Sequence, residues 1–91
     1  MEWFNAHVTV DRLYRDPEDN DLIDQLDGWH PSISARPDGR LSARISLTAA
    51  SMMDAAVQAL VVVREATGTD AVALELMTER EFCEREGFAR E

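Results

Sequence analysis

Eight residues of unbroken alternation, 41–48, constrain the fold of this chain more than any other feature. The apolar positions are Leu41, Ala43, Ile45 and Leu47, and every residue between them is polar. A period of two is that of a strand with one buried face. A shorter alternation over 32–36, with Ile33 and Ala35 on one side, precedes the turn-forming residues Pro37-Asp38-Gly39-Arg40. The sequence therefore predicts a β-hairpin.

Two further segments, one at each end of the chain, have the same period. In the first, Phe4, Ala6, Val8 and Val10 are expected to face the core, and Asn5, His7 and Thr9 the other side. In the second, Val72, Leu74 and Leu76 are expected to face the core, and Ala73, Glu75 and Met77 the other side. Both segments are predicted strands.

Helix signals lie between the strands. Asp16 is expected to cap a first helix, with Pro17 at its first position, an apolar stripe of Leu22, Ile23 and Leu26, and an end at Gly28. Trp29 is expected to fold back onto its last turn.

A second, longer helix is predicted over 52–66. Ser51 and Asp54 resemble a capping box and Gly68 follows the end. The stripe expected to lie on the sheet is Met53, Ala56, Val57, Leu60 and Val63. Another capping box, Thr78-Glu79-Arg80-Glu81, predicts a short, charged C-terminal helix.

The order strand, helix, strand, strand, helix, strand is typical of the ferredoxin-like α+β fold, βαββαβ. We expect a four-stranded antiparallel sheet with two helices on one face. Residues 1–77 would form this domain, and 78–91 a C-terminal helix or tail. With 91 residues, the chain is long enough for one core.

Composition excludes several classes of protein. The net charge is −9, all nine basic residues are Arg, and an acidic chain repels phosphate backbones, so no direct nucleic-acid binding is expected. Cys83 is the single cysteine, so no internal disulfide is possible. The longest apolar stretch, 55–63, is too short to span a membrane, and the N-terminus has no signal-peptide pattern. A cytoplasmic protein without a membrane partner is expected.

The polar face of the sheet is the main candidate surface. If both helices cover one face, the other is open, and there the residues proposed for interaction are His7, Thr9, Arg36, Arg44, Ser46 and Glu75. An antiparallel sheet can also expose such a face to water without any function. RNA recognition is disfavoured because the central strands present no aromatic residues for stacking. An acylphosphatase is disfavoured because residues 11–16 include no Gly.

The sequence gives little support for a catalytic site or a metal site. His7, His30 and Cys83 are scattered without the short spacings of zinc ligands, so neither a metal nor another cofactor is expected. His30, between Trp29 and Pro31, is interpreted as a packing residue rather than a base. A small enzyme that uses His7 or His30 as acid or base remains an alternative.

Acidic residues concentrate on the first helix. They are Asp16, Glu18, Asp19, Asp21, Asp24 and Asp27. The stretch lacks the Gly and terminal Glu of a calcium loop. Because the charges of this stretch are all negative, they suggest a second alternative, a DNA mimic or antirepressor that blocks a nucleic-acid-binding protein.

Three motifs resemble small actinobacterial and actinophage proteins. They are Gly28-Trp29-His30-Pro31, Ala66-Thr67-Gly68, and Met77-Thr78-Glu79-Arg80-Glu81-Phe82. In such proteins a similar domain precedes a helix-turn-helix, whereas this sequence has only Gly87-Phe88-Ala89-Arg90-Glu91 at that point. The resemblance implies dimerisation or partner contacts and carries over no catalytic residue.

These observations favour a non-enzymatic module. It would bind a protein partner, form a homodimer, or both, through the polar sheet face or the acidic helix. A small phage or regulatory protein acting on a host protein fits this interpretation.

Overall fold

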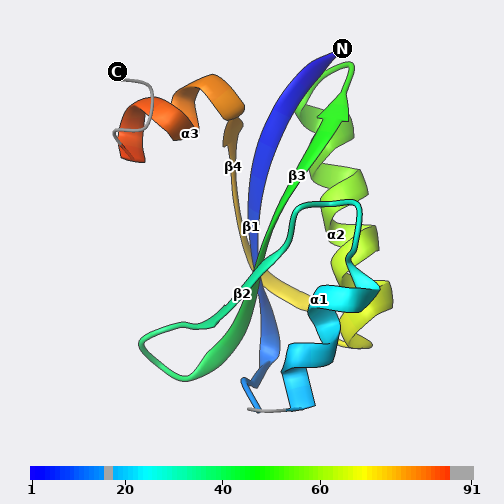
Figure 1. Cartoon of the computed structure of the whole chain (residues 1–91), viewed down its shortest axis with the longest axis vertical. Coiled ribbons are helices and arrows are strands. Elements are labelled where there is room, and N and C mark those ends of the chain that lie inside the picture. The colour runs from blue at the N-terminus through cyan, green and yellow to red at the C-terminus, as the bar shows by residue number, and fades with distance from the viewer. Residues whose placement is uncertain (16–17, 87–91) are drawn as a thin grey trace.

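The computed structural model describes residues 1–15 and 18–86, and its centre is a four-stranded antiparallel sheet (Figure 1). The strands are β1 (Glu2–Leu13), β2 (Ser32–Ala35), β3 (Arg40–Ala49) and β4 (Ala71–Thr78), in the spatial order β2-β3-β1-β4. The helical elements are η1 (Glu18–Asn20), α1 (Asp21–Gln25), α2 (Met52–Thr67) and α3 (Glu79–Glu86). The predicted α+β class, with two main helices and a short C-terminal helix, is confirmed.

One face of the central strands forms the core, as the alternation predicts. The buried apolar residues of β1 and β3 are Phe4, Ala6, Val8, Val10, Leu41, Ala43, Ile45, Leu47 and Ala49. The register pairs Ala6 with Ile45 and Val8 with Ala43, so side chains on one face meet across the two strands. The strands are longer than predicted, because pairing continues beyond the alternating residues.

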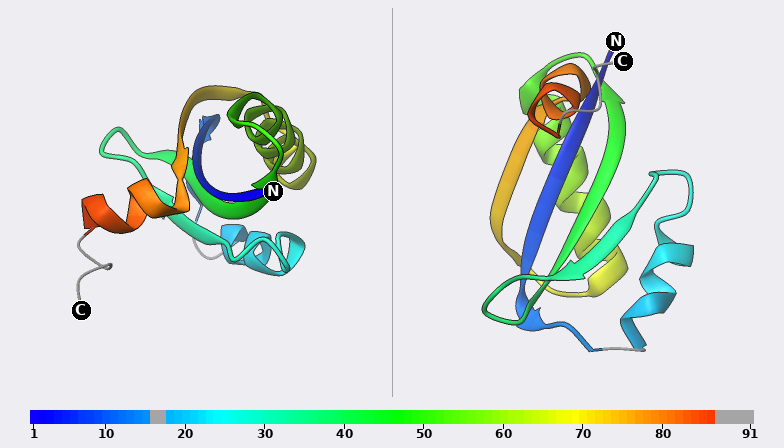
Figure 2. Two further views of the ribbon diagram at one scale, coloured as in Figure 1. Left: turned by 90° about the horizontal axis from the view of Figure 1, so that it is seen from above. Right: turned by 60° about the vertical axis from the view of Figure 1, so that its left-hand side comes forward.

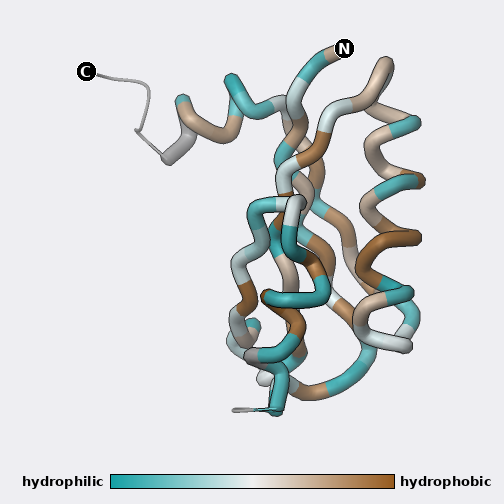
Figure 3. Tube along the Cα trace, turned by 45° about the vertical axis from the view of Figure 1, so that its right-hand side comes forward, coloured by the Kyte–Doolittle hydropathy of each residue, from teal (hydrophilic) through white to brown (hydrophobic). Residues whose placement is uncertain are grey.

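The face of α2 that packs on the sheet differs from the predicted stripe. Val63 is fully buried and Leu60 packs on the core, as predicted. Ala55 and Ala59 are also fully buried, whereas Met53 is 76% exposed and Val57 57% exposed. Apolar residues occur on nearly every side of this helix, as the hydropathy colouring in Figure 3 shows, so periodicity alone does not select the inward side. Small alanines let the helix approach the sheet closely, and Met53, Val57 and Val61 then lie outward.

Strand β4 lies at the edge of the sheet and is less buried than predicted. Leu74 and Leu76 face the core but are only half-buried, and Val72 is exposed. The register explains Val72, because Thr9 pairs with Ala73 and the next residue of β1 pairs with Ala71. Val72 is therefore the extra residue of a β-bulge, which removes it from the regular alternation.

Capping interactions fix the ends of α2 and the start of α3, as expected. Ser51 Oγ accepts from the N–H of Asp54 at 3.2 Å, and Gly68 closes the helix with a φ of 71°. Thr78 Oγ1 accepts from the N–H of Glu81 at 3.0 Å. These bonds satisfy N–H groups that have no partner within the helix.

The first helix is shorter than predicted and begins with the 3₁₀ turn η1. The expected cap, Asp16-Pro17, lies outside the described residues. Leu22 and Leu26 are buried as predicted, but Ile23 is 45% exposed because a five-residue helix presents only a narrow inward face. Gly28 ends the segment with a φ of 95°, and Trp29 N–H donates to the carbonyl of Leu26 at 2.9 Å.

The helices lie on both sides of the sheet. Seen from above, α1 and α2 are on one side and α3 is on the other (Figure 2). The guanidinium carbon of Arg44 on β3 lies 4.9 Å from the centre of the Phe82 ring on α3. The face predicted to be open is therefore partly covered by the C-terminal helix.

Candidate functional site

The middle of the polar sheet face carries a row of three ionisable side chains. His7 on β1 pairs in register with Arg44 on β3 and with Glu75 on β4. Nδ1 of His7 lies 3.4 Å from an Arg44 guanidinium nitrogen and 3.8 Å from Oε1 of Glu75. Side chains directly opposite each other on adjacent strands are necessarily neighbours, so β-sheet pairing alone builds this row.

The environment of His7 disfavours its protonated form. Burial lowers the pKa of His7 most strongly, and the positive charges of Arg44 and Arg36 lower it further. The charge and hydrogen bond of Glu75 raise the pKa, but their effect is smaller. The imidazole is therefore held neutral at neutral pH.

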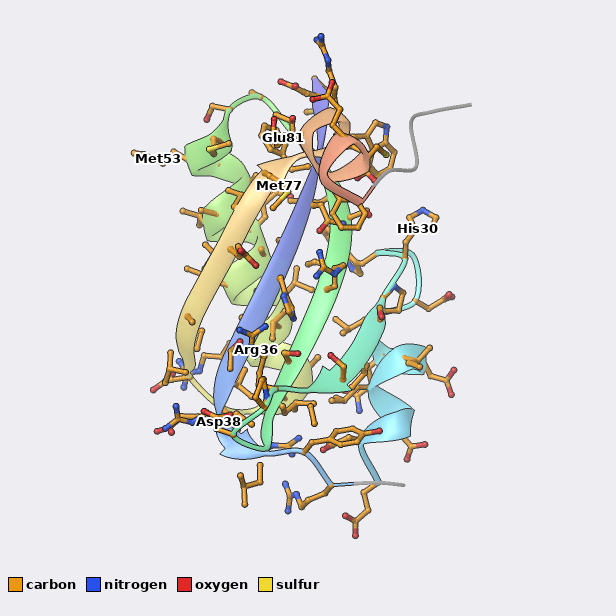
Figure 4. All side chains as sticks on the ribbon, turned by 90° about the vertical axis from the view of Figure 1, so that its left-hand side faces the viewer. His30, Arg36, Asp38, Met53, Met77 and Glu81 are labelled. Carbon is orange, nitrogen blue, oxygen red and sulfur yellow. The ribbon has the colours of Figure 1, made fainter. Side chains whose placement is uncertain are left out.

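A hollow of about 250 Å³ opens beside this row. It is lined by His7 and Thr9 from β1, by Ala73, Leu74 and Glu75 from β4, and by Arg36 from the hairpin. Figure 4 shows Arg36 over the sheet face, in front of β1. The hairpin thus brings a guanidinium group back across the sheet to the hollow.

Part of the remaining polar face is closed, which corrects the expectation of a fully open surface. Asn5 is 4% exposed and accepts a hydrogen bond from Arg44 at 2.8 Å. Ser42 is fully buried, with its hydroxyl 3.0 Å from that of Ser34 on β2. Because α3 covers Arg44 and Ser42 bonds to Ser34, the middle of this face is largely closed, and the hollow is its main recess.

The structure brings five of the six proposed interaction residues together. Four of them line the hollow: His7, Thr9, Arg36 and Glu75. Arg44 does not line it but contacts His7. Ser46 is half-buried one row away, opposite Asn5, and its backbone N–H donates to the carbonyl of Trp29 at 2.7 Å. Ser46 is therefore not part of the hollow.

The acidic helix presents fewer charges to solvent than predicted. Glu18, Asp21, Asp24 and Asp27 are exposed, whereas Asp16 lies outside the described residues. Asp19 is buried, so its assignment to the acidic surface is wrong.

Both Asp19 carboxylate oxygens accept from the Arg12 guanidinium, at 2.8 and 3.0 Å, and one also accepts from Arg15 N–H at 2.6 Å. The Arg12 hydrogen bonds hold the pKa of Asp19 below its usual value. The residue ties the end of β1 to η1.

The remaining candidate ligands lie apart from the hollow. His30 is exposed, has a φ of 53°, and its ring lies edge-on to Trp3 at 6.2 Å between centroids. Cys83 is a half-buried free thiol on α3. Within residues 1–15 and 18–86, no three His, Cys, Asp or Glu residues are grouped so that they could hold a metal ion.

A second surface, which sequence reasoning missed, lies where α2 borders β4. We call it the α2–β4 surface and define it by Met53, Val57, Val61 and Val72, each about half exposed or more. In Figure 4, Met53 projects beyond the outer side of β4. The alanines at 55, 59 and 66, spaced for one helical face, were the signal that the opposite, larger residues point outward.

A hollow of about 400 Å³ lies near the α2–β4 surface, between Met52, the first residue of α2, and the second half of β4. Its other lining residues are Glu75, Leu76, Met77, Thr78 and Glu81. This hollow places the start of α2 beside the second half of β4.

The fold and these sites define a small α+β domain with a polar hollow on one sheet face and an apolar border along its edge strand. The chain matches no protein-family model, and no significantly similar curated protein or solved structure was found. Among the described helices, none has the length and apolar character needed to cross a membrane. The function is therefore argued from the geometry alone.

Proposed function

We propose that this domain is a non-enzymatic interaction module with a ferredoxin-like fold, and that it forms a homodimer through the α2–β4 surface. The strand order β2-β3-β1-β4, with each helix joining two strands that are not neighbours, supports the ferredoxin-like assignment. The main support for the dimer is the row of exposed apolar residues on α2, together with the outer edge of β4, with which no described strand pairs.

The two edges of the sheet differ in how they are protected. β2 has four residues and stands between Pro31 and Pro37, and short strands flanked by proline resist pairing with another chain. β4 has eight residues and no proline, and its bulge at Val72 leaves residues 73–78 regular. No described strand pairs with its outer edge. This edge can accept another strand.

Charge favours a second copy at this place. Two chains of net charge −9 repel each other, so they associate best where few charges lie. Residues 55–63 of α2 carry no charge, and Glu75 is the single charged residue of β4. If β4 pairs antiparallel with β4 of a second copy, a two-fold axis relates the two chains. The α2–β4 surface of one copy then meets the α2–β4 surface of the other. The α2 helices of both copies would then lie side by side on the same face of an eight-stranded sheet.

The dimer predicts a mass of 20.4 kDa, twice the 10.2 kDa of one chain, in sedimentation equilibrium at micromolar concentration. Val57→Arg is expected to weaken dimerisation by about a hundredfold or more, because it buries an unpaired charge. This substitution lowers the net negative charge, so greater repulsion between chains cannot explain the loss.

Ile23→Arg is the matched control, since Ile23 is an exposed apolar residue on α1, away from the α2–β4 surface. This variant should remain a dimer. A wild-type mass of one chain, or a Val57→Arg variant that still forms dimers with unchanged affinity, would overturn the proposal.

The exposed acids favour a second candidate, mimicry of a nucleic-acid backbone. Glu18, Asp21, Asp24 and Asp27 form no ion pair with any other described residue. A basic protein held by these charges should dissociate steeply as salt rises. The expected result is that changing Asp21, Asp24 and Asp27 together to Asn abolishes capture of a DNA-binding protein, while Asp38→Asn does not. Capture that survives the triple change, or that is insensitive to ionic strength, would refute mimicry.

A further inference from the structure

Two arginines of the polar sheet face have no carboxylate within 4 Å among the described residues. Arg12, Arg40, Arg64 and Arg80 each have a carboxylate oxygen within 4 Å. Among the described residues, Arg36 and Arg44 have none, although the chain carries twice as many acidic as basic residues. No described carboxylate therefore lies within ion-pair distance of either guanidinium group.

Both arginines place positive charge at or near the same hollow. Arg36 lines it directly, and Arg44 contacts His7, which forms part of its wall. Glu75 is the acid in the lining, and its side chain is 62% exposed and 3.8 Å from His7. At His7 the two arginines together outweigh Glu75, because their charges lower the pKa of the imidazole more than Glu75 raises it. Arg36 and Arg44 therefore place positive charge on the His7 side of the hollow, while Glu75 places a negative charge in its lining.

The donors around the hollow suit an oxyanion. A guanidinium group offers two parallel N–H bonds that match the oxygens of a carboxylate or phosphate. Thr9 adds a hydroxyl, and the imidazole of His7 can donate from whichever ring nitrogen carries the proton. The volume of about 250 Å³ limits the ligand to a small molecule.

We propose that this hollow binds the phosphate or carboxylate group of a small molecule, with Arg36 as the principal ligand and Thr9 and His7 as additional donors. Arg44 would position His7 and contribute charge. The proposal does not depend on dimerisation, since every residue named here belongs to one chain.

The test is an NMR titration of the intact chain with sodium phosphate and, separately, with sodium acetate, against sodium chloride at equal ionic strength. We expect saturable shifts at the amides of His7, Thr9 and Ala73–Glu75, with a Kd of about 10 mM or lower for at least one anion. Saturation by phosphate alone identifies phosphate as the group bound, and saturation by acetate alone identifies carboxylate.

Substitutions separate a built site from general attraction. Arg36→Gln should weaken binding at least about fivefold through the loss of charge-assisted hydrogen bonds. Arg36 is exposed and has no described side-chain partner to lose, so this variant should fold normally. Arg64→Gln, at an exposed arginine on α2, should bind like the wild type. Glu75→Gln should tighten binding by about twofold, because it removes a like charge from the lining.

Two results would overturn the proposal. One is that neither anion gives saturable shifts at the residues of the hollow. The other is that Arg36→Gln titrates with the same affinity as the wild type.

Discussion

Replacing Asp19 with alanine is expected to destabilise the fold by about 3 kcal/mol in denaturant unfolding at neutral pH. The Asp19 and Arg12 side chains are 6% and 18% exposed, and two hydrogen bonds join them. Removal of the carboxylate leaves a largely buried guanidinium without its counter-charge and takes an acceptor from Arg15 N–H. The penalty arises mainly from that unpaired charge.

Two further variants test this explanation. Arg12→Met combined with Asp19→Ala should recover at least about 1 kcal/mol, because no unpaired charge then remains. Asp70→Ala breaks an ion pair whose side chains are 77% and 64% exposed, so it should cost less than about 0.5 kcal/mol. If Asp19→Ala and Asp70→Ala lowered the free energy of unfolding equally, burial of the Arg12–Asp19 pair would not explain its effect on stability.

The same pair gives a defined pH dependence. The pKa of Asp19 in the folded state is below its value in the unfolded chain, which is about 3.9. Its stabilising contribution is therefore complete above the unfolded pKa and is lost as the pH falls through the folded pKa. The difference in unfolding free energy between wild type and Asp19→Ala should shrink in acid. A difference that stays constant down to about pH 2 would contradict the assignment.

Ala59→Leu is expected to cost about 1 to 3 kcal/mol, because α2 packs its alanine face against the sheet. Ala59 is fully buried, so three added heavy atoms must displace the helix or distort side chains of the core. Gln58→Leu is the matched control one residue earlier, at an exposed position, and should change stability by less than about 0.5 kcal/mol. Denaturant unfolding of both variants measures the difference.

The comparison also decides how α2 is oriented. If the predicted stripe of Met53, Ala56, Val57, Leu60 and Val63 were centred on the sheet, Ala59 would lie at the edge of the packed face and not at its middle. Leucine would then be tolerated there. A neutral Ala59→Leu would therefore contradict the observed packing and remove the basis for the α2–β4 surface.

Local patterns predicted the elements but not how exposed each one is. Alternation over 41–48 identified β3 and its core face, and Ser51, Gly68 and Thr78 identified the helix ends, because these signals depend on a residue and its near neighbours. Alternation wrongly predicted that Val72 faces the core, because a bulge depends on how two distant strands pair.

The candidate sites were predictable to different degrees. His7 and Glu75 were placed on one face from their strand positions, and pairing brought them within 3.8 Å. Arg36 follows β2, and the predicted alternation gave its face, but only the curvature of the hairpin brings it over β1. Asp19 looked like one more surface acid in a run of acids, because its partner, Arg12, lies on β1, outside that run.

The sequence by itself determined the order and type of the strands and helices, the inward residues of β1 and β3, and the acidity of the chain. These follow from periodicities and capping preferences within a few residues. Only the tertiary structure decided that α3 covers the polar face, that α2 uses its alanines for packing, and that β4 has a free edge beside apolar side chains. Each of these depends on contacts between segments far apart in the chain, where shape and close packing select among faces that local pattern leaves equivalent.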